Sequence, residues 1–244
     1  MKRIRRKQLQ RRQAIFMISI VVFMGMVWSI YAVSSTISGN RITTSAESTA
    51  SLDRNMATSQ EASKRYKIVI DAGHGGKDPG AEGVSGNHER AYTLALSTKV
   101  YDLLQQEPMF EVHSTRTDDT FVTLKDRAQM ANDLDADAFV SIHGNTYVDP
   151  DVSGTETYYY ADESLLFASK VHEQLAEATG FKNRGVKKEG WEVLKLSNNL
   201  AVLLEIGFLT NPSDETSMLS EMHQDRTAQA IVSGIKKYFL DRES

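Results

Sequence analysis

Two histidines occupy matching positions, each at the end of a short apolar run rich in β-branched residues. His74 follows residues 67–71, His143 follows residues 138–142, and a glycine comes directly after each histidine. Because sites in α/β sheets form at the carboxyl ends of strands, we expect the two imidazoles to share one site. Two histidines and one carboxylate can hold Zn²⁺ and leave a position open for water, so the pattern predicts metal-assisted hydrolysis.

The third ligand has two neighbouring candidates. Glu89 lies in the first turn of a helix predicted for residues 88–106, and His88 directly precedes it. A glutamate in a first turn also complements the helix dipole without binding any metal. The residues alone leave Glu89, His88 and the structural role of Glu89 open.

Glu205 stands inside an apolar run that predicts a buried strand over residues 200–206. A buried carboxylate is costly unless it is paired or functional. A strand-end glutamate that emerges into solvent is the structural alternative. If Glu205 is buried, its natural role is that of a general base acting on a metal-activated water.

Other residues carry weaker signals. Arg116 and Arg127 are candidates for binding an acidic substrate or for structural ion pairs. Residues 158–160 are three tyrosines, which we expect to pack in a strand rather than to form a platform for a sugar.

The sequence has no cysteine, which excludes thiolate zinc sites and cysteine nucleophiles. It also lacks a phosphate-binding loop, a Gly-x-Ser-x-Gly elbow and a His-Glu-x-x-His helix. The remaining histidines of the predicted strands and helices have no comparable setting: His113, His172 and His223.

The elements that must position these groups alternate along the chain. The patterns predict strands at residues 67–71, 111–115, 138–142, 155–160 and 200–206, and helices at 88–106, from 123 onward, 165–179 and 227–240. Such alternation predicts an α/β fold with a mostly parallel central sheet flanked by helices on both faces. We expect one catalytic domain over residues 67–244.

The chain before this domain predicts a membrane anchor. Residues 1–13 hold seven basic residues and no acidic ones, and residues 14–33 form an uncharged apolar run of 20 residues. A helix of that length spans a hydrocarbon core of roughly 30 Å, with the basic end in the cytoplasm and the domain outside. The alternative is a cleaved signal peptide, for which Ala32-Val33-Ser34 is a passable site and which would give a secreted enzyme.

Residues 34–66 are rich in Ser, Thr and charge and predict a disordered tether. Outside the basic segment the chain carries 21 basic and 32 acidic residues, a net charge of −11. An acidic body of this kind excludes nucleic acid as an expected partner.

Seven stretches together resemble one known family. Residues 67–239 are similar to the zinc-dependent N-acetylmuramoyl-L-alanine amidases of the amidase 3 type, which cleave bacterial peptidoglycan. The stretches that carry the resemblance are residues 68–81, 115–119, 124–132, 141–145, 154–159, 183–187 and 203–212, and Glu89 at a helix start and residues 193–194 match as well.

The resemblance implies that His74, Glu89 and His143 bind one Zn²⁺ and that Glu205 is the catalytic acid/base. The implied reaction is hydrolysis of the amide between N-acetylmuramic acid and the L-alanine of a peptidoglycan stem peptide. We expect a monomer, and the sequence identifies no activating partner. The alternatives are a zinc exopeptidase on a related scaffold and a degenerate peptidoglycan-binding domain.

Two departures from the family pattern lead to expectations. Gly144 replaces a small apolar residue after the second histidine, and we expect no effect beyond loop flexibility. Some members insert a long helix that plugs the site, whereas here one ordinary helix fills residues 161–182, so we expect no built-in plug.

Overall fold

The computed structural model describes residues 65–242. The predicted basic segment and anchor at residues 1–33, and the tether up to residue 64, lie outside the described residues. Within residues 65–242, no helix is both long enough and apolar enough to cross a membrane.

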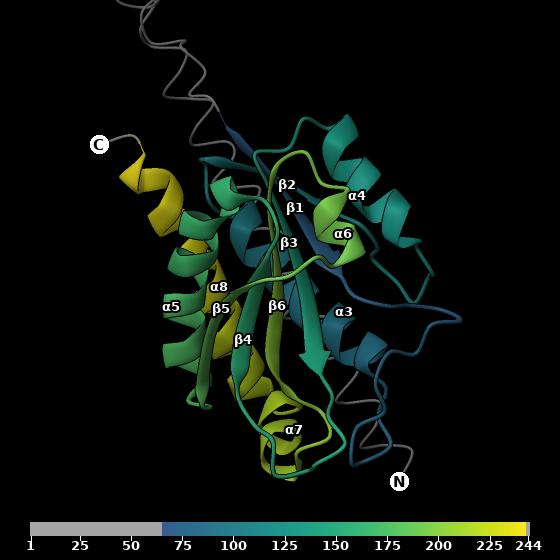
Figure 1. Cartoon of the computed structure of the whole chain (residues 1–244). Helices are drawn as coiled ribbons and strands as arrows, with labels where there is room; N and C mark the ends of the chain where they lie inside the picture. The colour runs from purple at the N-terminus through teal and green to yellow at the C-terminus, as the bar shows by residue number, and fades with distance from the viewer. Residues whose placement is uncertain (1–64, 243–244) are drawn as a thin grey trace, which may run out of the picture. The chain divides into compact units, whose positions relative to one another are not determined.

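A six-stranded sheet in the order β2-β1-β3-β6-β4-β5 forms the centre of the domain (Figure 1). The strands β2, β1, β3 and β6 run parallel, while β4 pairs antiparallel with β6 and β5 pairs parallel with β4. This confirms the predicted α/β fold with a mostly parallel sheet. The strands are β1 (Tyr66–Ala72), β2 (Phe110–Ser114), β3 (Ala138–Asn145), β4 (Thr155–Tyr159), β5 (Asn183–Lys188) and β6 (Leu200–Phe208).

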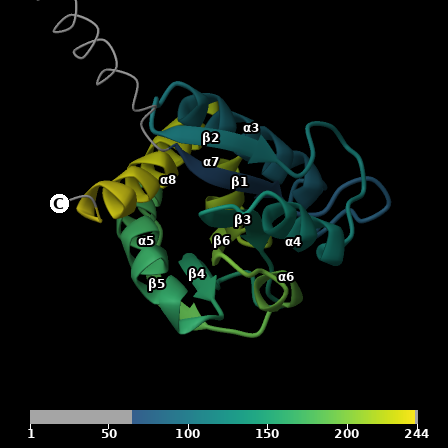
Figure 2. The same ribbon diagram turned by 90° about the horizontal axis from the view of Figure 1, so that it is seen from above.

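Helices cover both faces of the sheet (Figure 2). One layer contains α3 (Glu89–Gln105), α5 (Leu165–Thr179) and α8 (Glu221–Asp241), and α5 packs against α8 and β4. The other face carries α4 (Leu124–Asp133) and the short α6 (Glu192–Lys195), which pack against each other. A short 3₁₀ turn (Asp162–Ser164) precedes α5, and α7 (Pro212–Met218) follows β6.

Alternate residues of β6 face the two layers, as a central strand requires. Val202 and Leu204 are fully buried in the larger core under α3, α5 and α8. Ala201 and Leu203 join the smaller core with residues of α4 and α6. Glu205 continues the second set, so its side chain lies on the α4 and α6 face.

Most boundaries match the predicted elements, and the differences have local causes. The last helix begins at Glu221 rather than residue 227, because the Ser220 side chain accepts a hydrogen bond from the His223 amide and caps the helix. Three elements were not predicted: β5, α6 and α7. β5 is half-exposed and contains Gly185 in the left-handed region. Its sequence has no alternation of apolar and polar residues, so no strand was predicted there.

Candidate metal centre

His74 lies just beyond the end of β1 in a constrained loop. Its φ of 60° is in the left-handed region, which residues other than glycine rarely adopt. Two buried arginines hold the backbone there: Arg127 donates to the His74 carbonyl oxygen at 2.6 Å, and Arg116 to that of Gly73 at 2.8 Å. The surrounding hydrogen bonds therefore maintain a local strain that aims the imidazole at the sheet edge.

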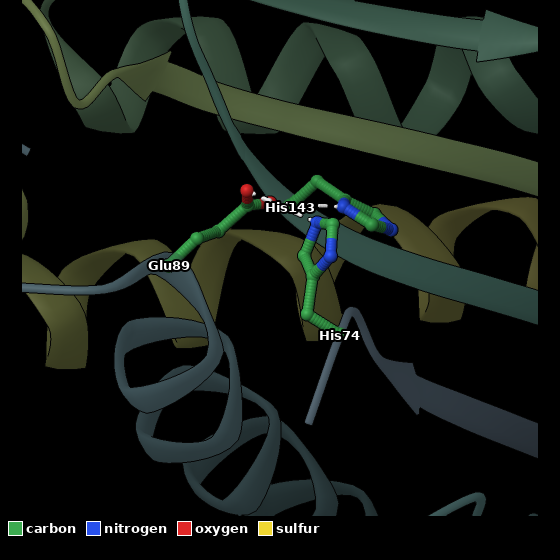
Figure 3. Close-up of side chains that lie close together, drawn as sticks. All are labelled: His74, Glu89 and His143. Carbon is green, nitrogen blue, oxygen red and sulfur yellow. Dashed lines mark hydrogen bonds and ion pairs between the residues drawn. The ribbon is translucent and has the colours of Figure 1, made fainter. Parts of the chain in front are cut away.

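His74, Glu89 and His143 meet at this edge (Figure 3). His74 Nε2 lies 3.0 Å from Glu89 Oε2, and His143 Nδ1 lies 2.9 Å from Glu89 Oε1. The ligand atoms of the three side chains all fall within 4.8 Å of one another, close enough to surround one cation. Two imidazoles and one carboxylate are a donor set that suits zinc and leaves a position free.

Glu89 is held by more than the histidines. It begins α3, is 4% exposed, and accepts hydrogen bonds from the amides of Ala81 at 2.9 Å and Gly144 at 3.0 Å. Burial raises the pKa of Glu89, but the hydrogen bonds and charges of His143 and His74 outweigh burial and bring it far below its ordinary value. The carboxylate is thus fixed and ionised. His88 occupies the N-cap position of α3 without a side-chain capping hydrogen bond, and the cluster does not include it.

Two glycines leave room for the cluster. A Cβ at Gly73 would lie 2.3 Å from His143 Cε1, and a Cβ at Gly80 would lie 2.6 Å from Glu89 Oε2. Both contacts are far inside van der Waals distance, so these positions exclude any side chain without displacement of the candidate ligands. The donor set and this close approach of backbone both fit a bound metal ion.

Glu205 lies beside the cluster on β6. Its register partners are His143 on β3 and Glu156 on β4. Its Oε2 atom is buried and has no hydrogen-bond partner among the described residues. Burial raises the pKa of Glu205 well above its ordinary value, and the negative charges of Glu89 and Glu156 raise it further. The Glu205 carboxyl, which can accept or donate a proton, therefore lies next to the candidate metal ligands with one oxygen unpaired.

A cleft of about 660 Å³ contains all four groups. Phe121 and Leu124, from the start of α4 and the segment before it, line the side near β1. Tyr158 and Trp191 line the side near β4. Among the described residues, none of residues 161–182 lines the cleft, so the segment predicted not to plug the site leaves it open.

The sequence matches the family model described as N-acetylmuramoyl-L-alanine amidase over residues 68–237. The chain belongs to this amidase family. Its activity is hydrolysis of the N-acetylmuramoyl-L-alanine amide of peptidoglycan, and the family implies a location outside the cytoplasm.

Known amidases share the fold of this domain. The catalytic domain of CwlV, an N-acetylmuramoyl-L-alanine amidase from Bacillus (Paenibacillus) polymyxa, is 44% identical with a TM-score of 0.70, covering 71% of this chain and 98% of that one. An N-acetylmuramoyl-L-alanine amidase from Clostridium difficile 630 is 37% identical with a TM-score of 0.72, covering 75% of this chain and 100% of that one.

Two further proteins are similar in sequence. YqiI of Bacillus subtilis is 43% identical over 176 residues, which are 70% of this chain and 84% of YqiI. LytH of Staphylococcus saprophyticus, a probable cell wall amidase, is 36% identical over 182 residues, 73% of this chain. The match spans only 60% of the length of LytH.

The candidate metal centre has a supporting residue that the sequence analysis missed. Asp78 Oδ2 lies 2.9 Å from His74 Nδ1. Histidines that bind metals usually donate their second ring N–H to a carboxylate, which fixes the tautomer and leaves the other nitrogen as ligand. The signal was present in the sequence, because Asp78 follows His74 by four residues in the same Gly-rich loop.

A second carboxylate, Asp71, anchors the loops around the candidate metal centre. It accepts hydrogen bonds from Ser141 at 2.6 Å, Thr115 at 2.6 Å and Arg127 at 2.7 Å, and all four side chains are buried. Burial raises the pKa of Asp71, but the charge of Arg127 and the hydrogen bonds from Ser141 and Thr115 lower it more.

Three expectations from the sequence need correction or completion. Arg127 forms the structural ion pair, with the buried Asp71 at 2.7 Å. Arg116 is also buried, but it donates to the backbone carbonyls of Ala72 and Gly73 rather than pairing with a carboxylate. Tyr158 lines the cleft rather than only packing in the sheet. Gly144 lies within β3 rather than in a loop, and a Cβ there would lie 3.0 Å from Leu209 Cδ1, so the glycine leaves room for neighbouring side chains.

Proposed function

We propose that this amidase is zinc-dependent, with His74, Glu89 and His143 holding the ion and Glu205 acting as acid/base. One observation carries the proposal: Glu205, whose buried Oε2 has no hydrogen-bond partner among the described residues, lines the cleft where two imidazoles and a carboxylate converge. A zinc ion in such a site supplies Lewis-acid chemistry, polarising a carbonyl and acidifying a water molecule.

Glu205 would move the protons of the reaction. Its carboxylate would accept the proton of the attacking water, and the same carboxyl would then give that proton to the amide nitrogen as the C–N bond breaks. The raised pKa suits this role, because it makes the ionised carboxylate of Glu205 a stronger base than an ordinary glutamate. The products are the muramoyl carboxylate and a peptide with a free L-alanine amine.

The remaining groups position the site. Asp78 would keep His74 in the tautomer that presents Nε2, and the amides of Ala81 and Gly144 keep the Glu89 carboxylate in place. Asp71 and Arg127 fix the backbone around these side chains. Preorganisation of this kind spares the reaction the cost of ordering the site.

Metal content tests the ligand assignment. The full-length protein should bind about one zinc per chain, and His143→Ala should lose most of it. His113→Ala is a matched control, because His113 lies on β2 and contacts Glu111 outside the cluster. Equal zinc content in both variants would contradict the assignment.

We further propose that residues 14–33 anchor the catalytic domain, residues 67–244, to the membrane through the tether. The support is the uncharged run of 20 residues after seven basic ones. A flexible tether of 33 residues has a reach of roughly 30 Å, which would confine the enzyme to wall close to the bilayer. Deletion of residues 1–33 should release the protein from membranes and spare its activity on isolated wall. Membrane retention of the deleted form would exclude this anchor.

A further inference from the structure

The cleft differs in character on its two sides along the sheet. In the strand order, β3 and β6 separate β1 from β4. Phe121 belongs to the β1 side, since its amide lies 2.9 Å from where a Cβ of Gly76 would stand. Tyr158 belongs to β4, and Trp191 packs edge-on against it with ring centroids 5.9 Å apart. The candidate metal centre and Glu205 lie between these two sides.

The position of Glu205 gives the substrate a direction. The group that protonates the leaving amine must lie on the amine side of the scissile bond. Glu205 stands on β6, next to β4 and away from β1. We propose that the stem peptide leaves the reaction centre along the β4 side, over Tyr158 and Trp191, and that the muramoyl sugar lies on the β1 side near Phe121. This inference rests on the proposed role of Glu205.

Trp191 has the features of a ligand contact. It is 49% exposed although it lines the cleft, and its backbone carbonyl begins α6 by accepting from the amides of Leu194 and Lys195. The Trp191 backbone is thus fixed by the helix start and its indole contacts Tyr158, while the side chain stays half-exposed at the cleft. A rigid aromatic face gives large contact area to a ligand at little entropic cost.

Tyr158 contacts charged groups on the β4 side of the cleft. Its hydroxyl donates to Glu156 at 2.8 Å, and Lys187 also binds Glu156 and lies 5.8 Å from the Tyr158 ring centroid. The Lys187 side chain remains 39% exposed. The β4 side of the cleft therefore offers two aromatic rings, a surface that suits the apolar groups of a peptide, while Lys187 is paired with Glu156 outside the cleft lining.

Tryptophan fluorescence tests the placement directly. The chain has two tryptophans, so the full-length Trp28→Phe protein reports on Trp191 alone. Titration with a free stem pentapeptide beginning with L-alanine should shift or quench the emission. The peptide-free disaccharide of N-acetylglucosamine and N-acetylmuramic acid should leave it unchanged. A response to the disaccharide but not to the peptide, or to neither at millimolar concentration, would overturn the proposal.

Kinetics provide the second readout. Trp191→Ala should raise KM for a muramoyl pentapeptide about tenfold and abolish its advantage over muramoyl-L-alanine, with kcat nearly unchanged. Trp191→Phe should restore most of the affinity. Tyr147→Ala, an aromatic residue 55% exposed outside the cleft lining, is the matched control and should leave KM unchanged.

These results separate the inference from the proposed function. If the wild-type protein releases no stem peptide but the peptide still quenches Trp191, the assignment of zinc and Glu205 fails. The assignment of Tyr158 and Trp191 as a peptide-binding surface then still holds. If the enzyme is active and Trp191→Ala keeps its preference for the muramoyl pentapeptide, only the assignment of Tyr158 and Trp191 as a peptide-binding surface fails.

Discussion

Glu156 and Glu205 are register partners across the antiparallel pair of β4 and β6, yet only Glu156 is neutralised by cations. Arg184 Nε lies 2.6 Å from Glu156, and Lys187 and the Tyr158 hydroxyl also bind it. Burial raises the pKa of Glu156, but these partners lower it more. The ionised Glu156 thereby adds to the unfavourable charge environment of Glu205, so two neighbouring carboxyls have opposite pKa shifts.

Loss of the Glu156 carboxylate should destabilise the domain. Glu156→Gln leaves Arg184 and Lys187 without their counter-charge, at a cost of about 1–3 kcal/mol, below that of a fully buried pair because both cations stay partly exposed. Urea denaturation of this variant and of Glu177→Gln, an exposed control on α5, measures the difference. Equal urea midpoints for the two variants would show that the ion pairs of Glu156 contribute nothing to the stability of the fold.

The buried pair of Asp71 and Arg127 predicts acid sensitivity. The folded-state pKa of Asp71 lies below its ordinary 3.8, so its stabilisation is present above that pH and is lost as the pH falls below about 4. Asp71→Asn should cost about 3–5 kcal/mol at pH 7 and flatten the acid limb of the stability curve. Denaturation midpoints between pH 7 and pH 3 test this, and an unchanged acid limb in the variant would assign the acid sensitivity to other groups.

The close approach of Gly73 to His143 predicts a metal defect without a folding defect. A Cβ at position 73 forces the imidazole to move, so Gly73→Ala should weaken zinc binding about 10–100-fold. Gly190→Ala is the matched control, since the new Cβ would meet only the flexible end of Lys195. Zinc titrations that give both variants the wild-type affinity would show that the backbone at Gly73 relaxes freely.

Asp78 should matter for metal affinity rather than for folding. Asp78→Asn weakens the hold on His74 Nδ1 and should lower zinc affinity about 10–100-fold, while the melting temperature of the metal-free protein changes little because the side chain is partly exposed. Asp133→Asn, an exposed acid of α4 bonded to Gln129, serves as the control. If Asp78→Asn bound zinc with the wild-type affinity, Asp78 would have no role in positioning His74 for the metal.

The sequence predicted the groups that follow strand ends but not their supports. His74, His143 and Glu205 stand out because histidines after buried strands and a carboxylate within an apolar run are rare and costly. Glu89 could be separated from His88 only by the family resemblance or by the structure, because the choice depends on which side chain points to the sheet edge. Glu156 gave no signal, since its cations come from β5, which lacks a strand pattern. Likewise, the contact between Gly73 and His143 joins distant residues and exists only after folding.

The most direct test of the account is product analysis with the full-length protein on purified peptidoglycan. We expect wild-type enzyme to release stem peptides beginning with L-alanine, identified by mass spectrometry, with release lost after chelation and restored by zinc. Glu205→Gln should bind zinc normally and lose activity by at least about 100-fold, because only the proton acceptor is removed. Peptide release that persists in metal-free protein, or in zinc-loaded Glu205→Gln at the wild-type rate, would contradict the account.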